Sequence, residues 1–86
     1  MGLDLVEMVM RIEEEFEIEI SDEISVTFTS PKIVIDYLHS LPKYQGDIRY
    51  REYIADKVWI IIEDEAGINR QDFNENSRFI EDMGMD

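Results

Sequence analysis

The chain has 86 residues, a formal net charge of −13 and no cysteine. This length predicts one small domain spanning residues 1–86, with a modest core. The charge argues against nucleic acid and anionic membranes as partners and favours basic protein surfaces. The absence of cysteine excludes disulfides, thiolate metal sites and a cysteine nucleophile. Since there is no basic leader followed by an apolar run, and no stretch long enough to span a bilayer, we expect a cytoplasmic protein.

The first predicted helix covers residues 3–18. At helical spacing its apolar side chains fall on one line, which predicts a buried face made of Leu5, Val9, Ile12 and Phe16. The opposite side is mostly acidic and carries Asp4, Glu7, Arg11, Glu14 and Glu15. Gly2 is an acceptable N-cap, and Asp4 in the first turn suits the positive end of the helix dipole. The pattern alone indicates an ordinary amphipathic helix with a solvated acidic face.

The segment after this helix permits two interpretations. Residues 21–23 are typical of a cap or turn, whereas residues 24–29 alternate apolar and polar side chains as a β-strand does. A lone strand has no partner for its backbone hydrogen bonds. We therefore expect a loop with about one helical turn.

The other helices are marked by proline and glycine. Ser30 followed by Pro31 predicts a helix over residues 31–40, which Pro42 ends; its expected buried side chains are Val34, Tyr37, Leu38 and Leu41. Residues 41–49 form a linker without periodicity.

A second long helix is predicted over residues 50–66, closed by Gly67, with a core stripe of Tyr50, Ile54, Val58, Ile61 and Ile62. The long helices should pack together around Val9, Ile12, Phe16, Val34, Leu38, Val58 and Ile62.

Trp59 and Ile60 lie at the edge of that stripe or away from it, with Tyr53 nearby. Left in water, they form an exposed apolar patch of the kind found at interfaces, which predicts a homodimer through Trp59 and Ile60. Exchange of the two halves across the linker gives a second route to a dimer. The alternative is a monomer in which these side chains fold over the linker.

Several segments resemble the acyl carrier protein family. Residues 3–20 (LDLVEMVMRIEEEFEIEI) are similar to the family's helix II, which follows the serine that bears the pantetheine arm, and residues 35–38 (IDYL) are similar to its helix IV. The ending Phe79-x-Glu81-Asp82-Met83-Gly84-x-Asp86 is similar to the loop that immediately precedes that serine. The order of segments therefore resembles a circularly permuted carrier protein, rejoined through residues 41–49. Gly2 stands in the place of the serine, between Asp86 and Leu3.

The resemblance implies an all-α fold, a small antiparallel helical bundle with residues 1–40 and 50–86 as its two parts. In this family the acidic helix II docks on basic surfaces of acyl-transferring enzymes and of phosphopantetheinyl transferase; the matching residues are Asp4, Glu7, Glu13 and Glu14. The family carries acyl groups on 4'-phosphopantetheine, but Gly2 has no hydroxyl, so no arm is expected on this chain. Two function classes follow: a carrier module of fatty acid, lipid or polyketide biosynthesis, or a non-carrying interaction or scaffold protein. An engineered permutant is a variant of either.

Other motifs are weaker. Asp72-x-Asn74-x-Asn76 imitates the start of an EF-hand loop, but Ser77 and Met83 occupy the positions that need glycine and glutamate, so no metal site is expected. His39 lies near a helix end, where a dipole contact is favoured over catalysis. With no nucleophile paired to a base and no phosphate-binding glycine loop, we do not expect an enzyme.

Overall fold

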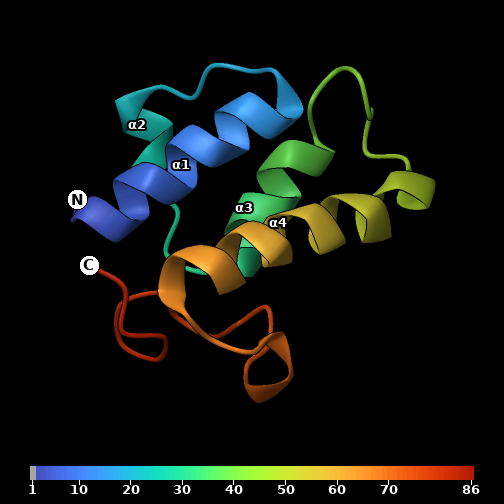
Figure 1. Ribbon diagram of the computed structural model, residues 1–86. Helices are drawn as coiled ribbons and strands as arrows, with labels where there is room; N and C mark the ends of the chain where they lie inside the picture. Colours follow the sequence, from blue (N-terminus) through green and yellow to red (C-terminus); the bar gives the residue numbers. More distant parts are fainter. Residues whose placement is uncertain (1) are drawn as a thin grey trace.

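The computed structural model describes residues 2–86, and within them it contains helices and no strand. The elements are α1 (Leu3–Phe16), α2 (Asp22–Ser25), α3 (Pro31–His39), the 3-10 turn η1 (Ile48–Tyr50), α4 (Arg51–Ala66) and the 3-10 turn η2 (Arg70–Asp72). The expected small helical bundle is confirmed. Helix α4 is its centre, because it contacts both α1 and α3 (Figure 1).

Helix α1 has the predicted one-sided burial. Its buried side chains are Leu5, Met8, Val9, Ile12 and Phe16. The helix ends at Glu17, which adopts a left-handed conformation (φ 55°) and donates its backbone N–H to the carbonyl of Glu13. The helix therefore stops slightly before the predicted end at residue 18.

The segment between α1 and α3 contains one helical turn, α2, so the predicted loop with a single turn is confirmed and the strand alternative is wrong. Ser21 caps this turn, since its hydroxyl accepts from the amide of Ile24 at 3.3 Å. After the turn, Phe28 is buried and its ring meets the ring of Tyr37 edge-on at 5.7 Å. This contact fastens the segment to α3.

Helix α3 begins at Pro31 as predicted, although the Ser30 side chain makes no capping hydrogen bond. Its buried side chains are Pro31, Val34, Ile35 and Leu38. The prediction missed Ile35, and it was wrong to bury Tyr37 and Leu41 fully, because both are only partly buried at the rim of the core. Ile35 was missed because α3 faces the core with two adjacent rows of side chains rather than one.

The linker folds back onto the helix ends. The ring of Tyr44 lies 6.5 Å from that of Phe16 and 5.5 Å from that of Tyr50. Lys43 donates from its ammonium to the carbonyl of Phe16, at the negative end of the α1 dipole. The linker thereby holds the end of α1 close to the start of α4.

His39 also holds the linker against the end of α3. Its Nε2 donates to the backbone carbonyl of Asp47 at 2.7 Å, and its own carbonyl accepts from the amide of Gly46 at 2.8 Å. Gly46 has φ 67°, a conformation that glycine adopts without steric cost. His39 therefore has a structural contact to the linker.

Two predictions for α4 are wrong. Trp59 was expected at the surface, but it is 2% exposed, because the chain after α4 covers it and the Arg70 guanidinium lies 5.5 Å from the ring centre. Tyr50 was expected in the core, but it lies in η1 before α4 and is 41% exposed. Ile60 is exposed as predicted, and the stripe residues Ile54, Val58, Ile61 and Ile62 are buried.

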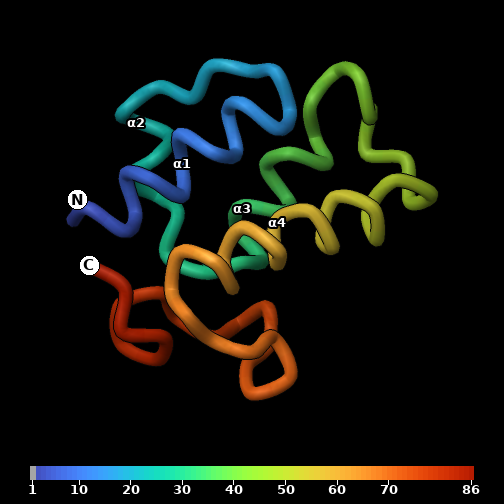
Figure 2. The backbone as a smooth tube through the Cα atoms, in the orientation of Figure 1, coloured from blue at the N-terminus to red at the C-terminus, as the bar shows by residue number. Residues whose placement is uncertain are grey.

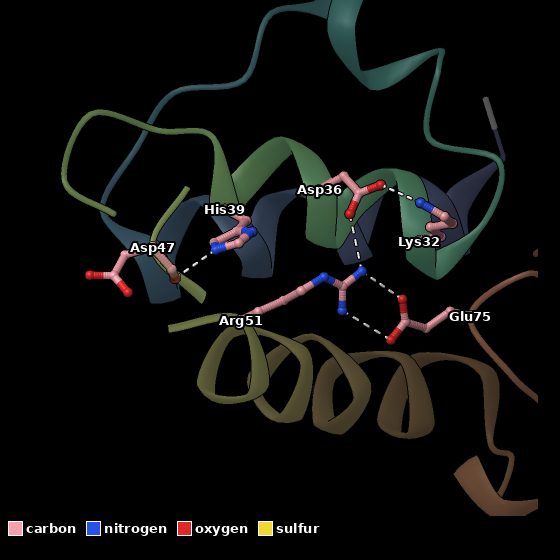
Figure 3. A network of polar contacts seen from close by, with 6 residues as sticks. All are labelled: Lys32, Asp36, His39, Asp47, Arg51 and Glu75. Carbon is pink, nitrogen blue, oxygen red and sulfur yellow. Dashed lines mark hydrogen bonds and ion pairs between the residues drawn. The ribbon is translucent and has the colours of Figure 1, made fainter. Parts of the chain in front are cut away.

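An ion-pair network braces α3, α4 and the loop that follows α4 (Figure 3). The Arg51 guanidinium donates to both carboxylate oxygens of Glu75, at 2.8 and 3.2 Å, and to Asp36 at 3.0 Å. Lys32 donates to the other oxygen of Asp36 at 2.7 Å. The hydrogen bond from Lys32 is the main reason why the pKa of Asp36 lies below its ordinary value. This carboxylate therefore contributes stability above the ordinary pKa of aspartate, and the contribution is lost as the pH falls through the lowered value.

Within residues 2–86, no helix combines the length and the apolar composition needed to cross a lipid bilayer.

Candidate functional site

Gly2, the first residue that the structure describes, lies against the backbone of Asp86 at the start of α1, and Figure 2 shows the red C-terminal segment beside the blue helix. The backbone amide of Leu5 donates to the carbonyl of Asp86 at 2.9 Å. The amide of Asp86 lies 3.4 Å from a carboxylate oxygen of Asp4, which accepts its hydrogen. Residue 86 is thus held by the helix backbone and by a helix side chain.

These contacts have the pattern of a helix N-terminus. An α-helical amide donates to the carbonyl four positions earlier, and Asp86 accepts from Leu5 as a residue placed directly before Gly2 would. The side chain of Asp4, the second residue of α1, accepts from the amide of Asp86, which resembles the back-bond of a capping box. Gly2 itself forms no side-chain cap. Asp86 therefore provides the cap of α1 from the far end of the sequence.

The absence of a side chain at Gly2 is a requirement of this contact. A Cβ built on Gly2 would overlap the backbone carbonyl carbon of Asp86, and the backbone of residue 86 cannot move aside without leaving α1. Glycine permits such a close approach of two backbones. Glycine at position 2 therefore leaves the room that the backbone of Asp86 needs to lie against α1.

A cavity of about 180 Å³ lies beside this junction. Its walls come from Leu5 of α1, from the turn around Phe28, and from residues 78–81. Leu5 connects the two features, because its amide binds Asp86 and its side chain lines the cavity. The lining is mostly apolar, which suits a hydrocarbon group.

The acidic residues predicted on α1 do not share one environment. Glu7 and Glu14 are exposed and Asp4 is half-buried. Glu13 differs, because its carboxylate accepts from the amide of Ile20 at 2.8 Å and so fixes the chain after α1. Glu7 and Glu14 are thus the fully accessible members of the predicted set.

Basic side chains do little to neutralise this surface. Every lysine and arginine of the chain except Lys43 forms an ion pair within the fold. Arg11, the basic residue on α1, contacts Asp64 and Glu65 of α4, both at 3.2 Å. Among the side chains of residues 2–86, only Lys43 is then left outside an ion pair, so most of the excess negative charge is available to a basic partner.

Glu7 lies beside Glu65 at the seam between α1 and α4. The hydrogen bond between the two carboxyl groups, together with their mutual repulsion, raises the pKa of Glu7 above its ordinary value. A carboxyl group whose pKa is raised by folding destabilises the fold while it is ionised, and the effect disappears once the pH falls below the ordinary pKa of glutamate.

Replacing Glu7 by glutamine should therefore raise the free energy of unfolding at neutral pH. The gain should shrink as the pH falls through the raised pKa, since the wild-type carboxyl then becomes protonated. Urea unfolding at neutral and at acidic pH measures this difference. Glu14→Gln is the matched control, because it removes the same charge from the same helix at an exposed position. An equal gain in both variants would assign the effect to net charge instead of to Glu65.

The EF-hand-like loop singled out in the sequence does not contribute to the junction between Gly2 and Asp86. Within the described residues, no group of three histidine or acidic side chains is arranged to hold a metal ion. In the loop that imitates an EF-hand, the side chain of Asn74 accepts from the amide of Asn76 at 2.8 Å and so serves the turn itself. Sequence reasoning missed the cavity, for which the only signals were isolated apolar residues such as Phe28 and Phe79.

Comparison with known proteins gives similarity over part of the chain. The chain is 49% identical over 42 residues to the acyl carrier protein of Buchnera aphidicola subsp. Schizaphis graminum (strain Sg), which covers 49% of this chain and 53% of the relative. The chain thus spans about half the length of the curated relative it matches. No family model matches the chain, and no solved structure matches it.

Proposed function

We propose that this chain is a circularly permuted module of the acyl carrier type, which docks on acyl-transferring enzymes but does not itself carry the prosthetic arm. The observation that supports this most is the junction at α1, where Asp86 caps the helix as the residue before Gly2 would. In acyl carrier proteins the modified serine has the place of Gly2, directly after the aspartate that Asp86 matches. Gly2 offers no hydroxyl for a phosphodiester bond.

The acidic face of α1 supports the docking part of the proposal. Glu7 and Glu14 are exposed there and can face the lysine and arginine side chains of a partner. Glu14 forms no ion pair among the described residues, so a partner would not have to break one. Asp4 stands at the helix start, beside the junction. Charge complementarity of this kind mainly accelerates association, so binding should weaken as salt concentration rises.

One experiment tests both parts. The chain is incubated with coenzyme A, a phosphopantetheinyl transferase and a conventional acyl carrier protein. Intact-mass spectrometry should show the arm on the conventional carrier and no added mass on this chain, because Gly2 replaces the serine. Excess chain should also slow modification of the conventional carrier by competing for the transferase. An arm on this chain, or absence of competition, contradicts the corresponding part of the proposal.

Charge reversal locates the docking surface. The double variant Glu7→Lys with Glu14→Lys should lose the competition. The control variant, Glu52→Lys with Asp72→Lys, makes the same change in charge at exposed positions outside α1 and should retain it. Equal loss in both variants would show that only the total charge matters.

A homodimer through α4 is a second candidate association. Trp59 is buried and cannot contribute, but Ile60 and Tyr53 are 54% and 51% exposed on the same helix. Light scattering at rising salt concentration should show a dimer that Ile60→Lys returns to a monomer, because salt screens the repulsion between two chains of charge −13. A monomer mass at every concentration contradicts this association.

A further inference from the structure

The outer side of α4 carries a line of exposed apolar side chains. Tyr53 and Ile60 lie on the helix, and Tyr50 directly precedes it. Residues spaced by three, four or seven positions share one side of a helix, so Lys57 belongs to the same line, between Tyr53 and Ile60. From Tyr50 to Ile60 the line is about 15 Å long, because each helical residue adds about 1.5 Å.

Tyrosine side chains gather at the start of this line. The ring of Tyr50 packs on that of Tyr44. Burial, together with repulsion from Tyr53 and Tyr50, raises the pKa of Tyr44, as expected for three neighbouring tyrosines. The Lys57 ammonium lies 5.7 Å from the centre of the Tyr53 ring. The line therefore has an aromatic end, a cation near its middle and the aliphatic Ile60 at its other end.

Charge divides α4 into two unlike halves. Residues 49–60 contain three basic and two acidic side chains, whereas residues 61–66 contain three acidic side chains and no basic one. Asp64 is exposed and continues the line beyond Ile60. A second copy of the chain can therefore contact residues 49–60 without facing an excess of like charge, and it meets repulsion at Asp64.

We propose that two copies of this chain pair along this line with their α4 helices antiparallel, so that Ile60 of each copy packs on Tyr50 of the other and Lys57 lies over Tyr53 of the other. This arrangement rests on the association through α4 proposed above, and it adds the direction and the contacts. Each group then meets a complementary one, since a tyrosine ring offers apolar area to Ile60 and a π face to an ammonium. Lys57 and Tyr53 already make the second kind of contact within one copy.

Two other arrangements bring like charges together. In a parallel pair, Lys57 and Asp64 would each face the same residue of the second copy. In an antiparallel pair centred on Ile60, Asp64 would face Asp56, because these residues lie four positions after and before the centre. The proposed pair is centred midway between Tyr50 and Ile60, so Asp64 falls beyond the start of the second copy's α4. Repulsion thus selects the proposed register.

The chain has no cysteine, so single introduced thiols can report on the register. Chains with Tyr50→Cys and with Ile60→Cys are mixed in equal amounts at high sodium chloride concentration, which screens the net charge. The mixture is equilibrated with reduced and oxidised glutathione. Intact-mass spectrometry separates the three disulfide-linked dimers, because the two substitutions change the mass differently. The mixed dimer should exceed each symmetric dimer by about tenfold, equivalent to about 1.4 kcal/mol.

Glu52→Cys, used in place of Tyr50→Cys, is the matched control. Glu52 is exposed on the same helix but lies about 100° around it from Tyr53, so its mixed dimer with Ile60→Cys should only reach the proportion of random pairing. Random proportions for Tyr50→Cys, or a predominant symmetric dimer of Ile60→Cys, overturn the arrangement while leaving association through α4 in place. A monomer mass of the unaltered chain in light scattering overturns the association and the arrangement together. None of these outcomes bears on the arm or on docking to the transferase.

Discussion

Replacing Trp59 by alanine should destabilise the fold by about 3–5 kcal/mol, the range found when a fully buried aromatic side chain is truncated. Trp59 is 2% exposed, and its removal would empty the largest side-chain volume of the core. The Arg70 guanidinium would also lose the ring that it covers. Because Trp59 is the sole tryptophan, urea unfolding is best followed by far-UV circular dichroism.

The neighbouring residue supplies the control. Ile60 is 54% exposed on the same helix, so Ile60→Ala should change the free energy of unfolding by about 0.5 kcal/mol or less, as surface substitutions generally do. Similar losses for the two variants would contradict the burial of Trp59. The original surface prediction for this residue would then be restored.

Phe79→Ala should have a comparable effect, about 3–5 kcal/mol. Its side chain is fully buried although it lies in a segment without helix or strand, and its amide binds the carbonyl of Thr29. The loss should appear in thermal or urea unfolding as lower stability of the whole bundle, because Phe79 belongs to the same core cluster as Val58 and Ile62.

Ile80→Ala is the matched control for Phe79, since Ile80 is 59% exposed. It should leave the unfolding free energy nearly unchanged. A small effect of Phe79→Ala would mean that residues 78–86 contribute little to the core.

The sequence predicted α1 well because this helix is buried on one side only. The line of apolar residues Leu5, Val9, Ile12 and Phe16 then marks the core face, and all four are buried, although the line omits Met8, which is also buried. For α4 the same reasoning found the buried Ile54, Val58, Ile61 and Ile62 but misplaced Trp59, because this helix is covered by α1, by α3 and by its own following loop. A helix covered on several sides has no single stripe, so Trp59 seemed exposed on the helical wheel.

The candidate site was only partly predictable. Gly2, Leu3 and Asp86 were singled out by resemblance to a family, since no periodicity connects residues at opposite ends of a sequence. The cavity depends on the shapes of side chains that meet from three segments, and such volumes are set by packing, which a linear pattern does not encode. The neutralising contacts of Arg11 with Asp64 and Glu65 were likewise invisible, because they join α1 to α4 across the fold.

The contact between Leu5 and Asp86 also has a consequence for biosynthesis. The first helix is synthesised well before the residue that caps it, and α4, on which it packs, is translated between the two. Contacts between residues so far apart in sequence form slowly, because a long loop must close first. The apolar face of α1 therefore stays uncovered on the ribosome until most of the chain has emerged. The contact that caps α1 forms only after residue 86 has emerged, and until then the apolar face of the helix is exposed to association with other chains.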